Sequence, residues 1–321
     1  MKKILFLICF FTLICISLQA VEIENVKGNA KPMGMIPIKG SKDVKTQWTI
    51  KYSGYGFYID VTCYDKNMKD IVATKFERDS DLSKDDSIEI RIKPNWEKEG
   101  KDDYYVYDVN VNNTQADALK QDYKKNFYFK SSVEKQFNCW IVHIYIPYVS
   151  MGINNNTYLK YDEYVDTSTF SCPIYTILNF GFNIERRYHP GKADEGRYIW
   201  QISKDGKMPW GIITQSPMFF VNELIDSSKV NLVALQKVGM KGNKFILYGP
   251  VIGKFDYTKA YTPQDWRYFK IYDYVTGKTY PAKDGVCLVD FDKGGNHKLI
   301  GIIYNNDNEV IGHSNLVEVK L

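Results

Sequence analysis

The sequence contains few of the residues that usually mark a catalytic or metal-binding protein. Its 321 residues include six cysteines and four histidines. No pair of cysteines has the C-x-x-C spacing of a zinc site, and no Gly-x-Ser-x-Gly phrase marks a serine nucleophile. The histidines are scattered along the chain without the spacing of metal ligands. The sequence therefore gives no local indication of a serine hydrolase or of a zinc enzyme.

Strong charge and long apolar runs are also scarce. The formal net charge is +4, which is too small to suggest nucleic acid as a partner. The one long apolar stretch, Ile4 to Leu18, follows Lys2 and Lys3 and ends just before the small residue Ala20. This pattern predicts a secretory signal peptide over residues 1–20, with an N-terminal membrane anchor as the alternative. No later stretch could cross a membrane as a helix, so we expect an exported protein that is periplasmic, secreted or at the cell surface.

Four cysteines follow the predicted signal peptide, namely Cys63, Cys139, Cys172 and Cys287. Export permits disulfides. A chain of this size can fold without them, and the pairing cannot be read from sequence. The sequence therefore leaves open whether any disulfide forms.

Helical periodicity is missing as well, and strand-like alternation takes its place through most of the chain. In the clearest stretch, Trp140, Val142, Ile144 and Ile146 would share one face of a strand. The strands predicted in the first part of the chain are residues 56–63, 87–92, 104–111, 140–146 and 178–184. Many short strands separated by turn-forming residues predict an all-β protein built as a β-sandwich.

A second group of predicted strands begins near residue 226. These strands are residues 231–238, 244–249, 266–272, 286–291, 298–304 and 309–320. About ninety residues with six or seven strands is the size of an immunoglobulin-like sandwich. We therefore predict two domains, residues 21–222 and residues 228–321, of which the second is immunoglobulin-like and serves as a spacer or docking unit.

Four landmarks occur in order in the first predicted domain. They are Arg78-Asp79-Ser80 with Asp85 to Ile90, Tyr107 to Asn110 with Asp117-Ala118-Leu119, Trp140 to Pro147, and Phe180 to Ile184 with Arg186-Arg187 and Trp200. Their order and spacing resemble the family 9 carbohydrate-binding modules and their DOMON-like relatives, above all the version at the front of bacterial outer-membrane barrel proteins. One departure is His143, where the family usually has Glu. The resemblance implies a DOMON-like β-sandwich that binds carbohydrate without cleaving it.

Aromatic and charged side chains are the candidates for sugar contacts. A pyranose presents a face of C–H groups that packs on a flat indole, while charged side chains form strong hydrogen bonds with its hydroxyls. The resemblance implies two rings around a terminal sugar, and Trp96 and Trp200 fall at loop or strand-end positions. The candidate carbohydrate-binding residues are Arg78, Asp79, Trp96, Asn110, Arg187 and Trp200. Each has a structural alternative, either as a buried anchor or as a member of a salt bridge.

An acidic run follows Arg78. Its carboxylates, Asp79, Asp81, Asp85 and Asp86, could supply the oxygen ligands that calcium prefers. The resemblance also implies structural calcium, because family 9 modules hold it. The alternative is a solvated acidic loop at the start of a strand. Calcium bound by these four residues is therefore a prediction from the sequence.

Three other functions remain as alternatives. The first is a structural or surface-assembly protein that uses the sandwich to contact a protein at the cell surface or outer membrane, and it would present a larger apolar and aromatic patch. The second is a glycan-active enzyme, which would need two facing carboxyls in a cleft. The third is haem binding, which some DOMON domains show, but no Met and His spacing selects axial ligands. Non-catalytic carbohydrate binding is the function that the sequence favours.

Overall fold

The computed structural model describes the larger part of both predicted domains. The described residues are 27–28, 33–94, 103–120, 122–153, 174–175, 178–200, 211–215, 218–219, 230–238, 244–252, 268–282, 286–292, 294–305 and 308–321. Within these ranges the regular structure is β-strand apart from the short 3-10 helices η1 (Met68–Asp70), η2 (Leu82–Lys84) and η3 (Tyr148–Met151). The all-β prediction is therefore confirmed. None of the helices in these ranges has the length and apolar character needed to span a membrane.

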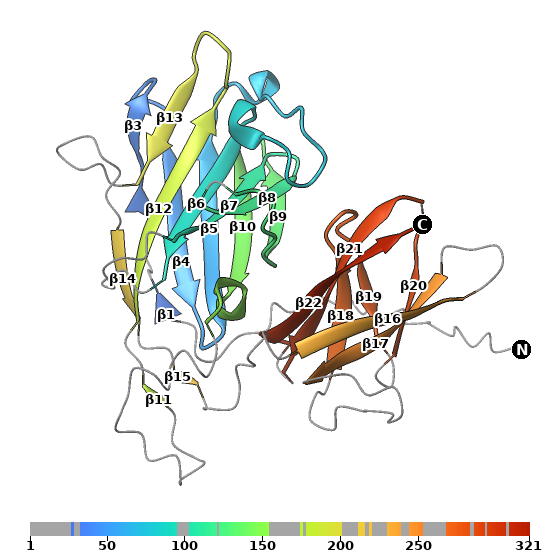
Figure 1. The fold of residues 1–321 in the computed structure, drawn as a ribbon. Coiled ribbons are helices and arrows are strands. Elements are labelled where there is room, and N and C mark those ends of the chain that lie inside the picture. Colours follow the sequence, from blue (N-terminus) through green and yellow to red (C-terminus); the bar gives the residue numbers. More distant parts are fainter. Residues whose placement is uncertain are drawn as a thin grey trace, which may run out of the picture.

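The first sandwich consists of two antiparallel sheets that lie against each other as two layers (Figure 1). The first sheet has the order β1–β4–β5–β10–β9, and β2 also pairs with β4. Its strands are β1 (Lys27–Gly28), β2 (Met33–Gly34), β4 (Thr46–Tyr52), β5 (Gly56–Tyr64), β9 (Lys130–Lys135) and β10 (Cys139–Pro147).

The second sheet has the order β3–β13–β12–β6–β7–β8, and β14 also pairs with β12. Its strands are β3 (Ile36–Lys39), β6 (Ser87–Lys93), β7 (Tyr105–Asn110), β8 (Gln115–Leu119), β12 (Leu178–Tyr188), β13 (Gly196–Ile199) and β14 (Gly211–Gln215). A separate two-stranded ribbon joins β11 (Ile174–Tyr175) to β15 (Met218–Phe219).

The core of the first sandwich follows from the alternation of apolar residues along the strands. Trp140, Val142, Ile144 and Ile146 of β10 are all buried, as their shared face predicts. From the opposite sheet, apolar residues of β6 and β12 pack into the same cluster. These residues are Ile88, Ile90, Ile92, Phe180, Phe182 and Ile184. Burial of large side chains from both layers is the main favourable contribution to folding.

Gly56 opens β5 at a point where the neighbouring strand passes very close. A Cβ atom at this position would lie 2.5 Å from the carbonyl oxygen of Ile146 and 2.9 Å from Cα of Pro147. We expect Gly56→Ala to lower the free energy of unfolding by about 1–3 kcal/mol, because the backbone of β10 must shift. Urea denaturation measures the change. Gly34→Ala in β2 is the control, since a Cβ there would have no atom within 4 Å, and an equal loss in both variants would contradict the packing argument.

The second sandwich packs a three-stranded sheet, β16–β17–β20, against a four-stranded sheet, β19–β18–β21–β22. Its strands are β16 (Val230–Val238), β17 (Lys244–Ile252), β18 (Tyr268–Asp273), β19 (Thr279–Pro281), β20 (Val286–Asp290), β21 (Asn296–Tyr304) and β22 (Val310–Lys320). Buried residues from both sheets, among them Leu232, Phe269, Val289 and Leu299, form its core. Whether this unit is an immunoglobulin domain by topology stays a prediction.

The two sandwiches contact each other directly, in the lower middle of Figure 1. Several side chains of the second sandwich join the core cluster of the first, namely Tyr272, Tyr274, Ile300, Ile302, Tyr304 and Val310. The hydroxyls of Tyr128 and Tyr304 lie 3.2 Å apart, and the hydroxyl of Tyr58 donates to Glu309 over 3.2 Å. A shared apolar contact and these two hydrogen bonds hold the two units together, so a cavity at their boundary has defined walls.

Candidate functional site

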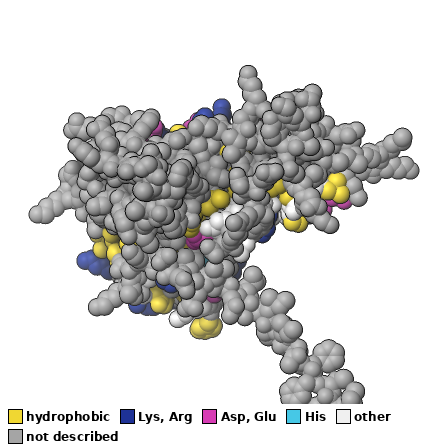
Figure 2. All heavy atoms as spheres, turned by 90° about the horizontal axis from the view of Figure 1, so that it is seen from below, with side chains coloured by type: hydrophobic (Ala, Val, Ile, Leu, Met, Phe, Trp, Pro, Cys, Tyr) yellow, Lys and Arg dark blue, Asp and Glu magenta, His cyan; other side chains and the backbone are white. Residues whose placement is uncertain are grey.

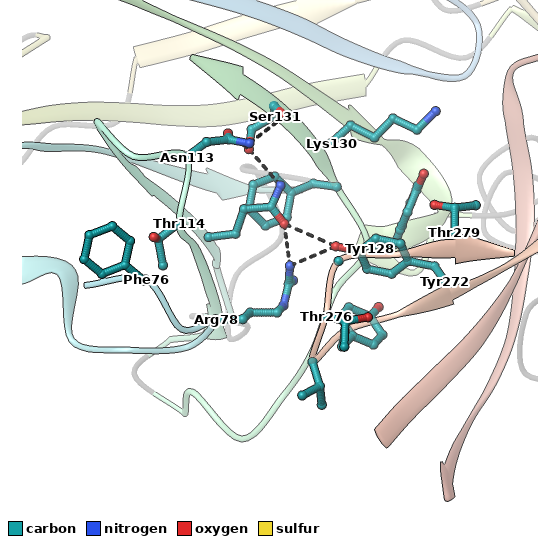
Figure 3. A pocket seen from close by; sticks show the side chains of 15 residues that line it. Phe76, Arg78, Asn113, Thr114, Tyr128, Lys130, Ser131, Tyr272, Thr276 and Thr279 are labelled. Carbon is teal, nitrogen blue, oxygen red and sulfur yellow. Dashed lines mark hydrogen bonds between the residues drawn. The ribbon is translucent and has the colours of Figure 1, made fainter. Parts of the chain in front are cut away.

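A cavity of about 520 Å³ opens where the two sandwiches meet, and we call it the junction pocket. The first sandwich contributes the loop around Phe76 and Arg78, the turn between β7 and β8, and the start of β9. The second sandwich contributes the end of β18, the turn that follows it and the start of β19. Figure 3 shows these side chains around the cavity, with Phe76 on one side and Tyr272 and Thr279 on the other. The volume lies within the range of small-molecule sites, about 300–1,000 Å³.

Arg78 forms the floor of the junction pocket. Its side chain is only 8% exposed and forms an ion pair with the fully buried Asp117. The guanidinium also donates to the side-chain oxygen of Gln115 over 2.5 Å and to the carbonyl of Phe127 over 3.3 Å. The rings of Phe129 and Tyr274 lie 5.5 Å and 4.8 Å from its central carbon. These contacts hold the planar group in one orientation, so that it can keep neighbouring polar side chains in place.

A chain of neutral hydrogen-bonding groups leads from Arg78 along one wall. The Gln115 amide nitrogen donates to Ser131 Oγ over 2.7 Å, and that hydroxyl donates to Asn113 Oδ1 over 2.7 Å (Figure 3). The Tyr272 hydroxyl lies 3.5 Å from the Gln115 oxygen and joins this chain from the second sandwich. Amide and hydroxyl groups retain lone pairs or protons after such bonds. The wall is therefore a row of oriented donors and acceptors at fixed positions.

Aromatic rings make up much of the remaining lining. Tyr128 and Tyr272 meet edge to face with ring centroids 5.2 Å apart, and Tyr272 meets Tyr274 in the same way at 5.2 Å. The Tyr274 hydroxyl is buried and has no hydrogen-bond partner within the described ranges. Phe76, by contrast, is 75% exposed. An exposed ring at the margin of a cavity offers a flat apolar surface to a ligand.

The described lining of the pocket contains no Asp or Glu. Two carboxylates lie behind Arg78: Asp117 is paired with its guanidinium, and Asp79 lies 3.8 Å from it. Hydrolysis of a glycosidic bond usually requires two carboxyls placed across the bond. The described lining of the junction pocket therefore does not contain the carboxyl pair of a glycosidase.

Two of the residues predicted to bind sugar, Arg78 and Asp79, thus lie at or beside this pocket. Arg187 lies elsewhere, on the outer side of the second sheet. Its guanidinium pairs with Glu89 and with Asp108, over 2.5 Å in the second case. We call this group of Glu89, Asp108 and Arg187, with the neighbouring Asn183, the charged face. Asn183 is 2% exposed, and its amide has no hydrogen-bond partner among the described residues.

Arg186 and Arg187 are neighbours on β12 and face opposite sides of the sheet. Arg186 is fully buried between the sheets and donates to Thr46 Oγ1 over 2.9 Å and to the carbonyl of Tyr64 over 3.0 Å. Arg187 points the other way, into the charged face. The alternation of side chains along a strand explains the difference.

Trp200 and Asn110, two further sugar candidates, have structural contacts. Trp200 packs edge to face on the buried Trp48, with centroids 4.7 Å apart. Asn110 is fully buried; its amide nitrogen donates to Lys75 and Asp85, and its oxygen accepts from two backbone amides of the β7–β8 turn. Asn110 therefore holds the turn that carries the pocket wall and has no capacity left for a ligand. Trp96 lies outside the described residues.

The four acidic residues predicted to bind calcium have separate partners. Asp85 accepts hydrogen bonds from the backbone amides of Thr74 and Lys75, over 3.1 and 2.9 Å. Asp81 caps η2, and Asp79 lies beside Arg78. Asp86 belongs to a different group in which its ligand atom lies within 4.8 Å of those of Asp65 and His189. The described residues therefore do not bring the four carboxylates together, and calcium binding stays a prediction.

The group around His189 is held together by hydrogen bonds. Nε2 of His189 lies 2.9 Å from Asp65 and Nδ1 lies 3.0 Å from Asp194. Asp86 accepts from the backbone amides of Val72 and His189 over 2.8 and 3.0 Å. Both ring nitrogens of the histidine already contact a carboxylate, so a metal ion would have to displace one of these bonds.

Burial raises the pKa of Asp86 above its ordinary value. A carboxyl with a raised pKa in the folded state stabilises the fold at low pH, and this contribution is lost as the pH rises through the folded-state pKa. Asp86→Asn keeps the shape of the protonated acid and does not titrate. We therefore expect wild type to lose stability relative to the variant as the pH rises from 4 to 7. Urea denaturation across this range tests it, and a shift toward wild type would contradict it.

The described cysteines form no disulfide with one another, which is one of the alternatives that the sequence leaves open. Cys63, Cys139 and Cys287 are buried and unpaired among the described residues. Cys172 lies outside the described ranges. The described cysteines therefore contribute to the sandwiches as small apolar side chains.

Sequence reasoning missed most of the junction pocket. Phe76, Gln115, Ser131 and Tyr272 come from distant segments, and two sandwiches must meet before they line one cavity. One local signal was available, because Tyr272 and Tyr274 are two residues apart near the end of a predicted strand. Residues at this spacing share a face of a strand, and a pair of tyrosines suits a binding surface.

Comparisons with known proteins give only loose likenesses. No protein-family model and no curated protein matches the sequence. Two similar solved structures are of a family 9 carbohydrate-binding module from Caldicellulosiruptor kristjanssonii, in complex with glucose and with cellotriose. Identity is 15% and 17%, each match covers 61% of this chain and 86% or 85% of the module, and the TM-score is 0.38 in both cases.

A third structure is a beta-1,2-glucanase from Parabacteroides distasonis. It is 9% identical, the match covers 92% of this chain and 36% of the glucanase, and the TM-score is 0.19. Likenesses at these scores assign neither a ligand nor site residues to this chain. The resemblance of the sequence to the family 9 modules therefore stays a prediction, and the function rests on the residues of the junction pocket.

Proposed function

We propose that this protein is exported and binds carbohydrate in the junction pocket without cleaving it. The observation that carries the proposal is the combination of groups in one cavity. Aromatic rings, amides and hydroxyls line it, and its described lining contains no carboxyl group. Carbohydrates present both C–H faces and closely spaced hydroxyls, so rings and oriented neutral hydrogen-bonding groups are their natural partners.

The capture is non-covalent. A sugar ring would pack on the exposed face of Phe76, while its hydroxyls replace water at Gln115, Ser131 and Asn113. Because Arg78 and Asn110 already hold this wall in position, little conformational entropy is lost on binding. Preorganised polar groups of this kind contribute specificity more than raw affinity. The periplasm or the cell surface is where an exported protein would meet such a glycan.

A protein that contacts only other proteins is the competing function. It would need a larger continuous patch of apolar surface. On the face drawn in Figure 2, the hydrophobic side chains of described residues show as small separate groups beside polar ones. The proposal therefore rests on the cavity, whose described lining has the groups that a sugar requires.

A glycan array tests the proposal with the full chain and with a variant whose pocket is filled. Thr279 lies on the exposed wall of the cavity, so Thr279→Trp should occupy part of the space a sugar needs. Leu316→Trp is the control, because Leu316 is 39% exposed on β22 and does not line the pocket. We expect wild type and the control to bind the same glycans and Thr279→Trp to lose them.

The array should be run both with calcium and with chelator. A loss of all binding in chelator, together with a lower unfolding temperature, would support the separate prediction of structural calcium. If folded wild type binds no glycan, or if Thr279→Trp binds as wild type does, the proposed function is wrong and a protein partner becomes the leading alternative.

A further inference from the structure

Lys130 places an ammonium group on the rim of the junction pocket. It is one of two basic residues in the described lining, and the other, Arg78, is paired with Asp117. Within the described ranges, no carboxylate lies within ion-pair distance of Lys130. Its ammonium instead lies 5.4 Å from the ring centroid of Tyr304. Figure 3 shows the side chain extended along the rim above Tyr128 and Thr279.

A second ammonium approaches the same ring from the other sandwich. Lys270 of β18 lies 5.3 Å from the centroid of Tyr304. Burial lowers the pKa of Lys130, and the charge of Lys270 lowers it further. Two like charges brought together by two different units repel each other. An anion bound beside Lys130 would be attracted to its ammonium group.

The other charged residue of the described lining, Arg78, already has carboxylate partners. Arg78 faces Asp117 at ion-pair distance and Asp79 at 3.8 Å, and the charge of Lys298 also acts on Asp79. Among the residues that line the cavity, the charge without a carboxylate at ion-pair distance within the described ranges is therefore that of Lys130. A concave site with one sign of charge concentrates ligands of the opposite sign.

We propose that the junction pocket prefers an acidic sugar, with its anionic group held against Lys130. The inference rests on the proposed function, since it concerns the ligand of the same pocket. Lysine acts as a point charge and imposes no planar geometry. The ligand therefore needs only an anionic substituent. A carboxylate, as in a uronic acid, and a sulfate ester both supply it, while the rings and the Gln115–Ser131–Asn113 wall hold the sugar itself.

Isothermal titration of the full chain with matched oligosaccharides tests this preference. The acidic members are oligomers of glucuronate, galacturonate and mannuronate. The neutral members are the corresponding gluco-, galacto- and manno-oligosaccharides. A sulfated galactan oligosaccharide distinguishes binding of sulfate from binding of carboxylate. We expect at least one acidic member to bind about tenfold tighter than its neutral counterpart, and the preference to weaken at high salt.

Lys130→Gln should remove most of this preference, because it should weaken binding of the acidic members far more than binding of their neutral counterparts. Lys124→Gln makes the same change in net charge at an exposed residue outside the pocket lining, and it should keep the preference. Equal binding of acidic and neutral members would overturn this inference and leave the proposed function intact. A preference that survives Lys130→Gln would also overturn it, whereas no binding by any sugar would overturn both.

Discussion

Replacing Phe76 by alanine should weaken glycan binding about tenfold and leave the fold unchanged. The ring is 75% exposed at the margin of the junction pocket, so it contributes little to the core and much to a ligand that packs on it. Loss of an aromatic contact together with its buried area accounts for about 1–2 kcal/mol of binding free energy, and 1.4 kcal/mol corresponds to a factor of ten. Titration with a glycan selected on the array measures the change.

Phe137→Ala is the matched control for this variant. Phe137 is 98% exposed in the turn between β9 and β10 and does not line the pocket. The control should bind as wild type does, and both variants should keep the unfolding free energy of wild type within about 0.5 kcal/mol. Unchanged affinity in Phe76→Ala would remove this ring from the site. An equal loss in both variants would point to a nonspecific effect of exposed aromatic residues.

The second large effect is on stability. Arg78→Met should lower the free energy of unfolding by about 3–5 kcal/mol, because it leaves the buried carboxylate of Asp117 without its partner. Burial raises the pKa of Asp117, and the guanidinium of Arg78 acts against this rise. Without the guanidinium the pKa of Asp117 rises further, and the carboxyl becomes protonated at mildly acidic pH. The loss should therefore be smaller at pH 5 than at pH 8, as urea denaturation at both values can show.

Two further variants separate the ion pair from other causes. Arg78→Met combined with Asp117→Asn removes both charges and keeps an acceptor for the amide of Phe127, which bonds to Asp117. It should recover much of the stability that the single variant loses. Lys39→Met breaks the exposed pair between Lys39 and Glu195 and should change stability little. A loss in Arg78→Met that does not depend on pH, and that the double variant does not reduce, would contradict the buried-pair account.

The central strands of the fold could be predicted because burial imposes a pattern on them. Residues 56–63 and 140–146 were expected as strands and correspond to β5 and β10, where apolar residues alternate with polar ones. The peripheral strands β9 and β13 were missed. Edge strand β9, Lys130–Lys135, is largely polar and exposed, so no hydrophobic alternation marks it.

The candidate site was predictable only in part, for a geometric reason. Arg78 could be selected from the sequence because it belongs to a charged landmark near a predicted strand. Its partner Gln115 carries no local signal, and the only local signal for Tyr272 is its spacing from Tyr274. Both residues reach the pocket through strand pairing and through contact between the two sandwiches. Asn110 shows the opposite case: its polar side chain suggests a ligand, but the turn that it holds uses every hydrogen bond it can make. Local sequence identifies residue chemistry, whereas long-range packing decides which groups face a ligand.

The most direct test is a crystal structure of the protein with the glycan that binds best on the array. We expect density for a sugar ring in the junction pocket, against Phe76 and within hydrogen-bond distance of the Gln115 and Ser131 side chains. Density on the charged face, beside Arg187 and Asn183, or at any site away from the junction would contradict this location for the binding site.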